Sequence, residues 1–386
     1  MKRLLVAFAL CGLLLQGCSW IKSWGDEEPG EPAPLVEFEP SLKLGKVWST
    51  NIGDGMGKAG LSMGPRYSSG ALFAADHKGR LVSINAETGS KNWELKTEQA
   101  FSGGPGLDED QIYMGTIDGR VIAYERSSGT ELWNAQVSSE VLAPPESADG
   151  IVVVRSIDGR VFGLDPVNGR RIWIYDHSVP LLTMRGNANL LVRAGIVFVG
   201  YDDGSVVSLR LTDGSVVWNQ VIVSPEGRTE LERLADVGQQ MVIVASDLIV
   251  SSYKNRVVSL AADSGRLLWF KEVSSATGIQ VDRTNLAISE SNGDLWMLDR
   301  RNGSTTWKVD RLTNRGLTRP AFYGNYVVVG DMEGYLHWLD SDIGSFVARE
   351  RVGKKGFAAA PLTVGTTLYV LTHDGKLTAL RAGAAL

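Results

Sequence analysis

The glycine-rich segment Gly55–Gly60 is the first place where residue types and spacing match a chemical motif. It reads Gly-Met-Gly-Lys-Ala-Gly, which is the glycine spacing of a dinucleotide-binding loop. Such a loop needs a strand before it and a helix after it, so that the helix N-terminus can hold the pyrophosphate. Here Gly64 and Pro65 follow closely and would stop a helix. We therefore interpret the segment as a connecting loop.

The four histidines form no metal-binding pattern. They stand at positions 77, 177, 337 and 373, and none has a second ligand at the spacing of a metal motif. Asn302-Gly303-Ser304 matches a glycosylation acceptor, but the same residues fill an expected turn. The sequence has no nucleophile elbow, HExxH pair or Walker loop. We predict no catalytic residue, no metal site and no cofactor.

Cys18 carries the clearest chemistry in the chain. Lys2 and Arg3 precede an apolar run, Leu4–Leu15, that is too short to cross a bilayer comfortably, as is typical of a secretory signal. The sequence Leu-Gln-Gly-Cys that ends at Cys18 resembles a bacterial lipobox, which implies cleavage after residue 17 and acylation of the cysteine. More than one acyl chain gives a stable membrane anchor. An ordinary signal peptide with an incidental cysteine is the alternative.

The residues around Cys18 agree with a lipid anchor. The one other cysteine, Cys11, lies in the segment that would be removed, so the mature chain could form no internal disulfide. Ser19, rather than Asp, follows the cysteine, and by resemblance to sorted lipoproteins this favours the periplasmic face of the outer membrane. Residues 18–42 are acidic and rich in proline, so we expect a flexible tether.

A repeat of about forty residues occupies the chain from residue 43 onward. In six copies a tryptophan follows the first turn residue by fourteen positions, as in Gly119 to Trp133 and Gly159 to Trp173. The first turn is Asp-Gly in three of these copies and Asn-Gly in a fourth, and both dipeptides suit the positive φ angles of a two-residue hairpin. After this turn, residues alternate at the two-residue period of a strand, and another strand-like run precedes the turn. Four short antiparallel strands at this period make one propeller blade.

The two ends of the repeat region predict how the ring closes. The last copy stops at Leu380-Arg381 after its third strand, and Leu44–Trp48 resembles the missing fourth strand. We predict an all-β, eight-bladed β-propeller over residues 43–381, with the N-terminal strand pairing in the last blade and a short tail at 382–386. Closure leaves no open sheet edge between the first and last blades. A seven-bladed ring is the alternative.

The recurring tryptophan has a structural interpretation. One ligand site cannot need seven indoles, whereas each ring can bury roughly 150–250 Å² between neighbouring blades. The seven residues are Trp48, Trp93, Trp133, Trp173, Trp218, Trp269 and Trp307. The pattern resembles the docking tryptophan of the pyrroloquinoline-quinone-type repeat, which occurs in quinoprotein dehydrogenases and in non-catalytic relatives. The dehydrogenases resemble one another in a vicinal cysteine pair that this sequence lacks, so we expect no enzyme.

Two segments between repeats are irregular. Ser178–Gly186 carries apolar residues where a polar loop is usual, and Ser224–Asp236 lengthens the interval between successive tryptophans to 51 residues from 40. Apolar side chains bordered by charges indicate a partner site. Local packing onto the propeller is the alternative. The formal net charge of −5, without a Lys or Arg run longer than two in the mature chain, argues against a nucleic-acid partner.

Lipobox, acidic tether, Trp-docked blades and the two irregular segments together resemble the propeller lipoproteins of the outer-membrane β-barrel assembly machinery. Glu232–Val237 and Gly330–Trp338 also resemble that family. The resemblance implies a non-catalytic scaffold that docks on the POTRA domains of the barrel-forming subunit BamA and assists folding and insertion of outer-membrane proteins. Unfolded clients are a further expected partner, and a small-molecule-binding propeller is the alternative.

The resemblance also implies which residues attach to BamA. They are Leu182, Met184, Arg185 and Asp236. Gly238 stands where relatives carry a second acidic residue, so that part of the contact differs here.

Overall fold

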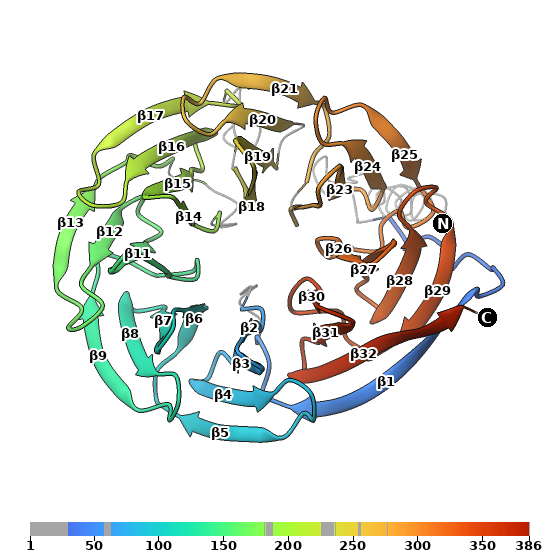
Figure 1. Cartoon of the computed structure of the whole chain (residues 1–386), viewed down its shortest axis with the longest axis horizontal. Coiled ribbons are helices and arrows are strands. Elements are labelled where there is room, and N and C mark those ends of the chain that lie inside the picture. The colour runs from blue at the N-terminus through green and yellow to red at the C-terminus, as the bar shows by residue number, and fades with distance from the viewer. Residues whose placement is uncertain are drawn as a thin grey trace, which may run out of the picture. The chain divides into compact units, whose positions relative to one another are not determined.

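Eight four-stranded antiparallel sheets form a closed ring in the computed structural model (Figure 1). The structure describes residues 30–57, 63–180, 182, 188–224, 235, 237–253, 256–275 and 277–385. The predicted eight-bladed propeller is therefore confirmed. The predicted signal peptide and Cys18 lie outside the described residues. No helix among the described residues is long and apolar enough to cross a membrane.

Each blade is a meander that runs from an inner to an outer strand. Blade 1 comprises β2 (Arg66–Ser68), β3 (Ala71–Ala75), β4 (Arg80–Asn85) and β5 (Lys91–Lys96), and blade 2 comprises β6 (Phe101–Leu107), β7 (Gln111–Thr116), β8 (Arg120–Glu125) and β9 (Glu131–Gln136). Blade 3 comprises β10 (Glu146–Ala148), β11 (Ile151–Arg155), β12 (Val161–Leu164) and β13 (Arg171–Tyr175), and blade 4 comprises β14 (Leu191–Arg193), β15 (Ile196–Gly200), β16 (Ser205–Arg210) and β17 (Val216–Val221). Blade 5 comprises β18 (Val237–Val244), β19 (Asp247–Ser252), β20 (Val257–Ala261) and β21 (Leu267–Lys271), and blade 6 comprises β22 (Ile279–Val281), β23 (Asn285–Ser289), β24 (Leu295–Asp299) and β25 (Thr305–Val309). Blade 7 comprises β26 (Ala321–Tyr323), β27 (Tyr326–Gly330), β28 (Tyr335–Asp340) and β29 (Phe346–Arg351), and blade 8 comprises β30 (Leu362–Val364), β31 (Thr367–Leu371), β32 (Lys376–Ala385) and β1 (Leu42–Asn51).

Strand β1 closes the ring by pairing antiparallel with β32, with Trp48 opposite Ala379. The pairing extends to Leu42 opposite Ala385. The C-terminal residues up to 385 are thus part of β32 rather than the short tail expected beyond 381, because β1 pairs with Ala382 and Ala385 on either side of an irregularity between Leu42 and Leu44.

The residues just before β1 also differ from the expected free tether. Ser41 N donates to the Val347 carbonyl over 3.0 Å. The Phe38 ring stacks on Phe346 at 5.7 Å between centroids, and the Arg349 guanidinium lies 5.1 Å from the Phe38 centroid. Aromatic stacking and the cation–π contact therefore hold this stretch against blade 7.

The seven repeated tryptophans lie between neighbouring blades. Each indole N–H donates to a backbone carbonyl of the following blade over 2.7–3.1 Å. A Cβ on Gly169, which has a φ of 71°, would lie 2.5 Å from the Trp133 ring, so both the backbone angle and the close approach require glycine there. Blade 7 has Ala348 at the tryptophan position, and the Tyr323 hydroxyl instead donates to the Thr366 carbonyl of blade 8 over 2.6 Å.

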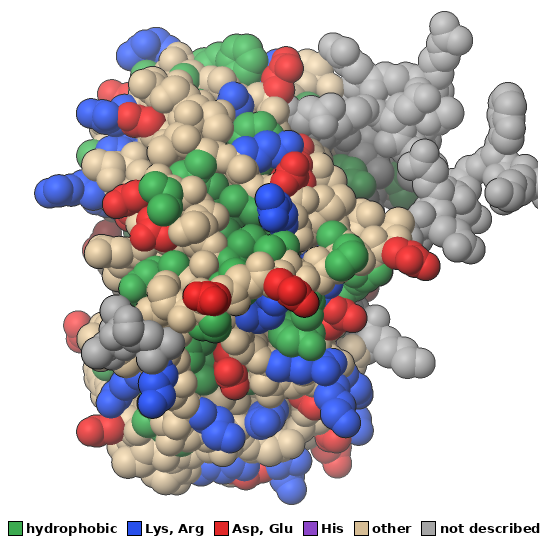
Figure 2. All heavy atoms as spheres, turned by 90° about the vertical axis from the view of Figure 1, so that its right-hand side faces the viewer, with side chains coloured by type: hydrophobic (Ala, Val, Ile, Leu, Met, Phe, Trp, Pro, Cys, Tyr) green, Lys and Arg blue, Asp and Glu red, His purple; other side chains and the backbone are tan. Residues whose placement is uncertain are grey.

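The ring has two distinct faces. Every segment that leads from the outer strand of one blade to the inner strand of the next lies on the same side, together with the turn between the second and third strands of each blade. We call this side the connection face. The side of the ring that Figure 2 shows carries Lys, Arg, Asp and Glu intermixed among apolar side chains. Such mixing is typical of a soluble surface rather than of a nucleic-acid-binding face.

Candidate partner-binding site

Leu182 is the one predicted attachment residue that the structure describes. It lies on the connection face between β13 and β14, and its side chain is 41% exposed. Met184, Arg185 and Asp236 lie outside the described residues, whereas Gly238 falls in β18. The described residues on either side of them nevertheless show how the two irregular segments meet the propeller.

The two irregular segments end against the same turn of blade 4. A Cβ on Gly200, the last residue of β15, would lie 2.4 Å from Val237 Cγ1 and 3.1 Å from Ala188 Cβ. Val237 N donates to the Tyr201 carbonyl over 3.2 Å. Ala188, Ala235 and Val237 are all buried. The ends of the two segments, at Ala188 and Val237, are nearly fifty residues apart in the sequence but lie against the same glycine. The repeat pattern alone did not reveal this.

A buried polar cluster lies beneath this meeting point. The Arg155 guanidinium donates from Nη1 to the Gly200 carbonyl over 2.7 Å, and its Nη2 lies 3.4 Å from Asp202 Oδ2. Its Cζ stands 5.0 Å from the centroid of the Tyr201 ring. Arg155 is 1% exposed and Asp202 is 3% exposed. The sequence analysis did not predict this cluster. The feature that could have indicated it is Arg155 itself, because it ends a strand whose other residues are all Ile or Val.

His177 joins the cluster from the start of the first irregular segment. Its ring stacks on Tyr201 with 3.9 Å between centroids, and Nε2 lies 2.8 Å from Asp203 Oδ2. Burial raises the pKa of Asp203, but hydrogen bonds from His177 and Ser205 outweigh it and hold that pKa below its usual value. Burial raises the pKa of Tyr201. Asp203 is therefore an ionised carboxylate that lies in hydrogen-bond contact with His177 Nε2.

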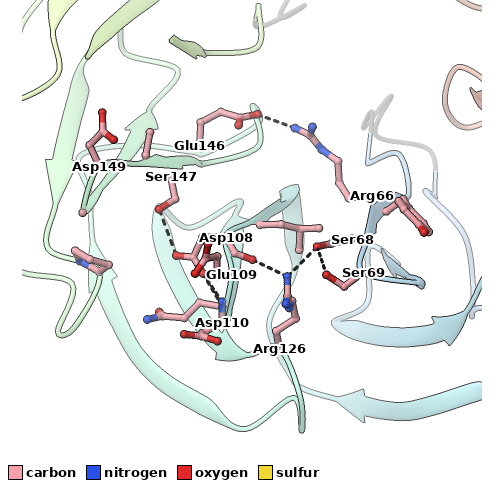
Figure 3. A pocket seen from close by; sticks show the side chains of 16 residues that line it. Arg66, Ser68, Ser69, Asp108, Glu109, Asp110, Arg126, Glu146, Ser147 and Asp149 are labelled. Atoms are coloured by element: carbon pink, nitrogen blue, oxygen red, sulfur yellow. Dashed lines mark hydrogen bonds and ion pairs between the residues drawn. The ribbon is translucent and has the colours of Figure 1, made fainter. Parts of the chain in front are cut away.

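A polar hollow of about 1100 Å³ lies on the opposite face across blades 1 to 3 (Figure 3). Arg66 pairs with Glu146 at 2.7 Å across the hollow. Arg126 donates to Ser68 Oγ and to the Asp108 carbonyl. Arg66 thus links blade 1 to blade 3, and Arg126 links blade 2 to blade 1. No group of three or more His, Cys, Asp or Glu among the described residues is placed to bind a metal.

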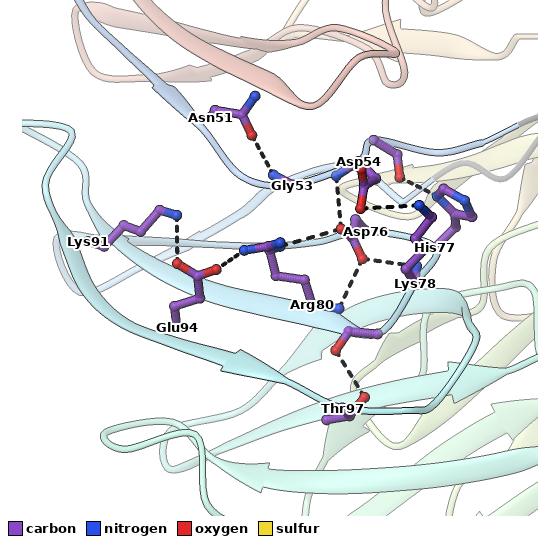
Figure 4. Close-up of polar contacts among 12 residues, drawn as sticks. Asn51, Gly53, Asp54, Asp76, His77, Lys78, Arg80, Lys91, Glu94 and Thr97 are labelled. Atoms are coloured by element: carbon purple, nitrogen blue, oxygen red, sulfur yellow. Dashed lines mark hydrogen bonds and ion pairs between the residues drawn. The ribbon is translucent and has the colours of Figure 1, made fainter.

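The glycine-rich segment after β1 bonds to blade 1 (Figure 4). Asp54 N donates to Asp76 Oδ2 over 3.0 Å, and His77 Nδ1 lies 2.9 Å from the Gly55 carbonyl. A Cβ on Gly55 would lie 2.0 Å from the His373 carbonyl of blade 8, which leaves no room for a cofactor phosphate beside that residue. The part of the segment from residue 58 to 62 lies outside the described residues.

Comparison with known proteins assigns the family. A family model described as outer membrane protein assembly factor BamB matches residues 77–309. A protein of that name from Xanthomonas campestris pv. campestris is 40% identical over 99% of this chain and 98% of its own length. Another from Pseudomonas aeruginosa is 46% identical over 90% of this chain and 92% of its own length. The crystal structure of BamB from Moraxella catarrhalis matches with a TM-score of 0.81 at 27% identity, covering 88% of this chain and 100% of that chain.

The chain belongs to the BamB family of outer membrane protein assembly factors. The resemblance inferred from the sequence is thereby confirmed. BamB proteins are non-catalytic assembly factors, so the expectation of no enzyme is confirmed by the family. Membership also makes this propeller a component of outer membrane protein assembly.

Proposed function

We propose that the protein is a scaffold subunit anchored through acylated Cys18 to the periplasmic face of the outer membrane. It docks on the POTRA domains of BamA and assists folding and insertion of β-barrel proteins. The contact residues are Leu182, Met184, Arg185 and Asp236. The observation that carries this proposal is that the ends of the two irregular segments, at Ala188 and Val237, both lie against Gly200, while Leu182 of the first segment is exposed.

The chemistry of these residues suits a small protein interface. A half-exposed leucine and, two residues further along the sequence, a methionine would supply an apolar anchor, and an arginine and an aspartate would supply a charged border. Such a contact needs no change in the propeller core, because Leu182 projects from a connection rather than from a strand. The ring thus presents Leu182 from a connection between two blades.

The outer strands of blades 4 and 5 supply a second surface, which we assign to unfolded client chains. Val216, Val217 and Val221 of β17 are 43–54% exposed, and Leu267, Leu268 and Phe270 of β21 are 40–48% exposed. Each outer strand has an unpaired edge. An extended apolar client segment could add to such an edge through main-chain hydrogen bonds.

The experiment that tests the BamA contact is affinity measurement with purified BamA. The double variant Arg185→Ala/Asp236→Ala and the single variant Leu182→Asp should each weaken binding at least tenfold without unfolding the ring. Val167→Asp is the matched control, because Val167 is 78% exposed on the opposite face. If the double variant co-purifies with BamA as fully as the natural chain does, the assigned surface is wrong.

A further inference from the structure

The outer strand of blade 7 is covered, unlike the outer strands of the other blades. Val347 of β29 is 8% exposed. The residues at the same repeat position in the other seven blades are all exposed, and they are Val47, Asn92, Leu132, Ile172, Val217, Leu268 and Thr306. The chain that precedes β1, coloured blue, lies beside β29 and supplies the cover (Figure 1). We call its residues 33–41 the strap.

The strap is bound to the propeller along its whole length. Ala33 N donates to the Thr313 carbonyl over 2.9 Å, and the Ala33 carbonyl accepts a hydrogen bond from Arg315 Nη1 over 2.7 Å. The Phe38 ring packs on a phenylalanine and an arginine of β29. Ser41 N bonds to a carbonyl of the same strand. The strap therefore crosses blade 7 in one defined path.

Arg315 is a residue that the propeller fold itself does not require. Its carbonyl accepts a backbone hydrogen bond from Met332 N, and in five other blades the residue that accepts the same bond is Gly55, Ala100, Glu140, Ser274 or Gly356. Arg315 is 2% exposed; its Nε donates to Asp331 and its Nη2 to Glu333, which leaves Nη1 for the strap. Because a buried guanidinium needs partners for its donors, the Ala33 carbonyl completes this site.

The strap changes the face of the ring at which the tether leaves. Strand β1 begins at the opposite face, since Leu42 pairs with Ala385 at the end of β32 that is far from the connection-face turn between β31 and β32. Ala33, in contrast, bonds to Thr313, which lies on the connection face between β25 and β26. Because β1 spans ten residues, these two exit points are about 30 Å apart along the strand direction.

We propose that the strap carries the lipid tether to the connection face, so that acylated Cys18 and Leu182 act from the same side of the ring. The inference rests on the proposed acylation of Cys18. The tether from Cys18 to Ala33 covers 15 residues (33 − 18), which reach at most about 50 Å. Moving the exit point by about 30 Å is a large part of that reach. The strap thus determines which face of the propeller is held nearer to the membrane.

The test compares the natural lipidated chain with a chain that lacks residues 33–41, in which residue 32 is joined to Leu42. The tether keeps its length of 15 residues (42 − 18 − 9) but leaves from the opposite face. Ile117→Cys places a fluorophore on the connection face and Val167→Cys places one on the opposite face, where these side chains are 46% and 78% exposed. The other cysteine of the mature chain, Cys18, is blocked by its acyl chain.

Phosphatidylcholine vesicles with nitroxide-labelled headgroups supply the quencher. We expect quenching at position 117 to be at least about twofold stronger than at position 167 in the natural chain, and the order to reverse in the deletion chain. Ala33→Pro/Phe38→Ala removes one hydrogen bond and the ring stack of the strap, and it should shift the ratio in the same direction. Glu37→Ala is the matched control, because Glu37 is an exposed residue of the strap, and it should keep the natural ratio.

The same ratio in the natural chain and in the folded deletion chain overturns the inference. If the deletion chain does not fold, an unchanged ratio in Ala33→Pro/Phe38→Ala overturns it instead. Cys18→Ser should give no quenching at either position. If the natural chain also gives none, the proposed anchor itself fails, which distinguishes that failure from a failure of the strap.

Discussion

Individual tryptophans define how neighbouring blades pack. Trp133 is 8% exposed, donates to the Pro166 carbonyl over 2.7 Å and covers Gly169 of the next blade. Indole area buried in this way contributes hydrophobic stabilisation, and the N–H finds the partner that a buried donor needs. The role is structural in our proposal, because each ring faces the neighbouring sheet rather than a common site.

Trp133→Ala should lower the free energy of unfolding by about 3–5 kcal/mol, the usual range for removing a large buried aromatic side chain. Denaturant titration measures this loss. Leu132→Ala is the control, since Leu132 is 48% exposed on the same strand and should cost much less. Equal losses for the two variants would contradict the packing role.

His337 is the residue whose burial predicts a pH dependence. It is fully buried, its Nε2 lies 2.9 Å from Asp331 Oδ2, and Arg349 Nε donates to its Nδ1 over 3.3 Å. Burial lowers the pKa of His337 despite the nearby Asp331 carboxylate, and the Arg349 and Arg315 guanidinium groups also lower it. The folded state therefore favours the neutral ring, with Nε2–H donating to Asp331.

Stability should be constant above about pH 6.5, where the histidine is neutral in both states, and should fall as the pH drops below it. The reason is that the unfolded chain then binds a proton that the folded chain does not. His337→Gln should reduce the fall in stability below pH 6.5. Part of that fall should remain, because burial also lowers the pKa of His373. Thermal unfolding between pH 7.5 and 5 checks this; an unchanged slope in the variant would refute it.

At the scale of elements, β1 is the strand that closes the eight blades into a ring. It supplies the outer strand of blade 8, and its Trp48 donates to the Ala86 carbonyl of blade 1 over 3.0 Å. Without it, the edge of β32 would be exposed. Exposed strand edges recruit other chains, so the seam should control both stability and aggregation.

A chain that begins at Ile52 should unfold at a lower temperature and self-associate, because the β32 edge is left without a partner. A chain that begins at Ala33 retains β1 and the contacts of Phe38, and it should unfold like the full chain. Scanning calorimetry and light scattering measure the two effects. A monomeric chain from Ile52 with natural stability would show that closure by β1 contributes little.

At the scale of the whole molecule, the propeller presents several separate surfaces. The connection face carries Leu182, the opposite face carries the hollow around Arg66, and the outer edge carries the apolar strands β17 and β21. Because each blade contacts mainly its two neighbours, a change on one surface should leave the others intact. This arrangement suits a subunit that holds several partners rather than one that transforms a substrate.

Cys18→Ser should release the protein into the soluble periplasmic fraction, because the proposed acyl chains supply the only stable membrane attachment that we assign. The purified variant should unfold at the same temperature as the natural protein, since the propeller does not include Cys18. Cell fractionation and intact mass measurement test this. Retention in the outer membrane without acylation would remove the anchor from the proposal.

The sequence by itself determined the architecture, because the features that specify a blade are local. Asp-Gly turns such as Asp158-Gly159 and the recurrent Trp at a fixed distance predict strand order, blade number and closure without knowledge of distant contacts. Family resemblance then supplied the attachment residues that we propose. Turn geometry needs only neighbouring residues, which is why this much could be predicted.

Only the tertiary structure decided which residues of different blades are in contact. Arg155 and Tyr201 are 46 positions apart, and nothing in either segment predicts that a buried charge meets an aromatic ring. Likewise, Ala188 and Val237 both lie against Gly200, where a Cβ would meet each of them. These contacts depend on the angle and spacing between blades, which the closed ring sets as a whole and no single segment encodes.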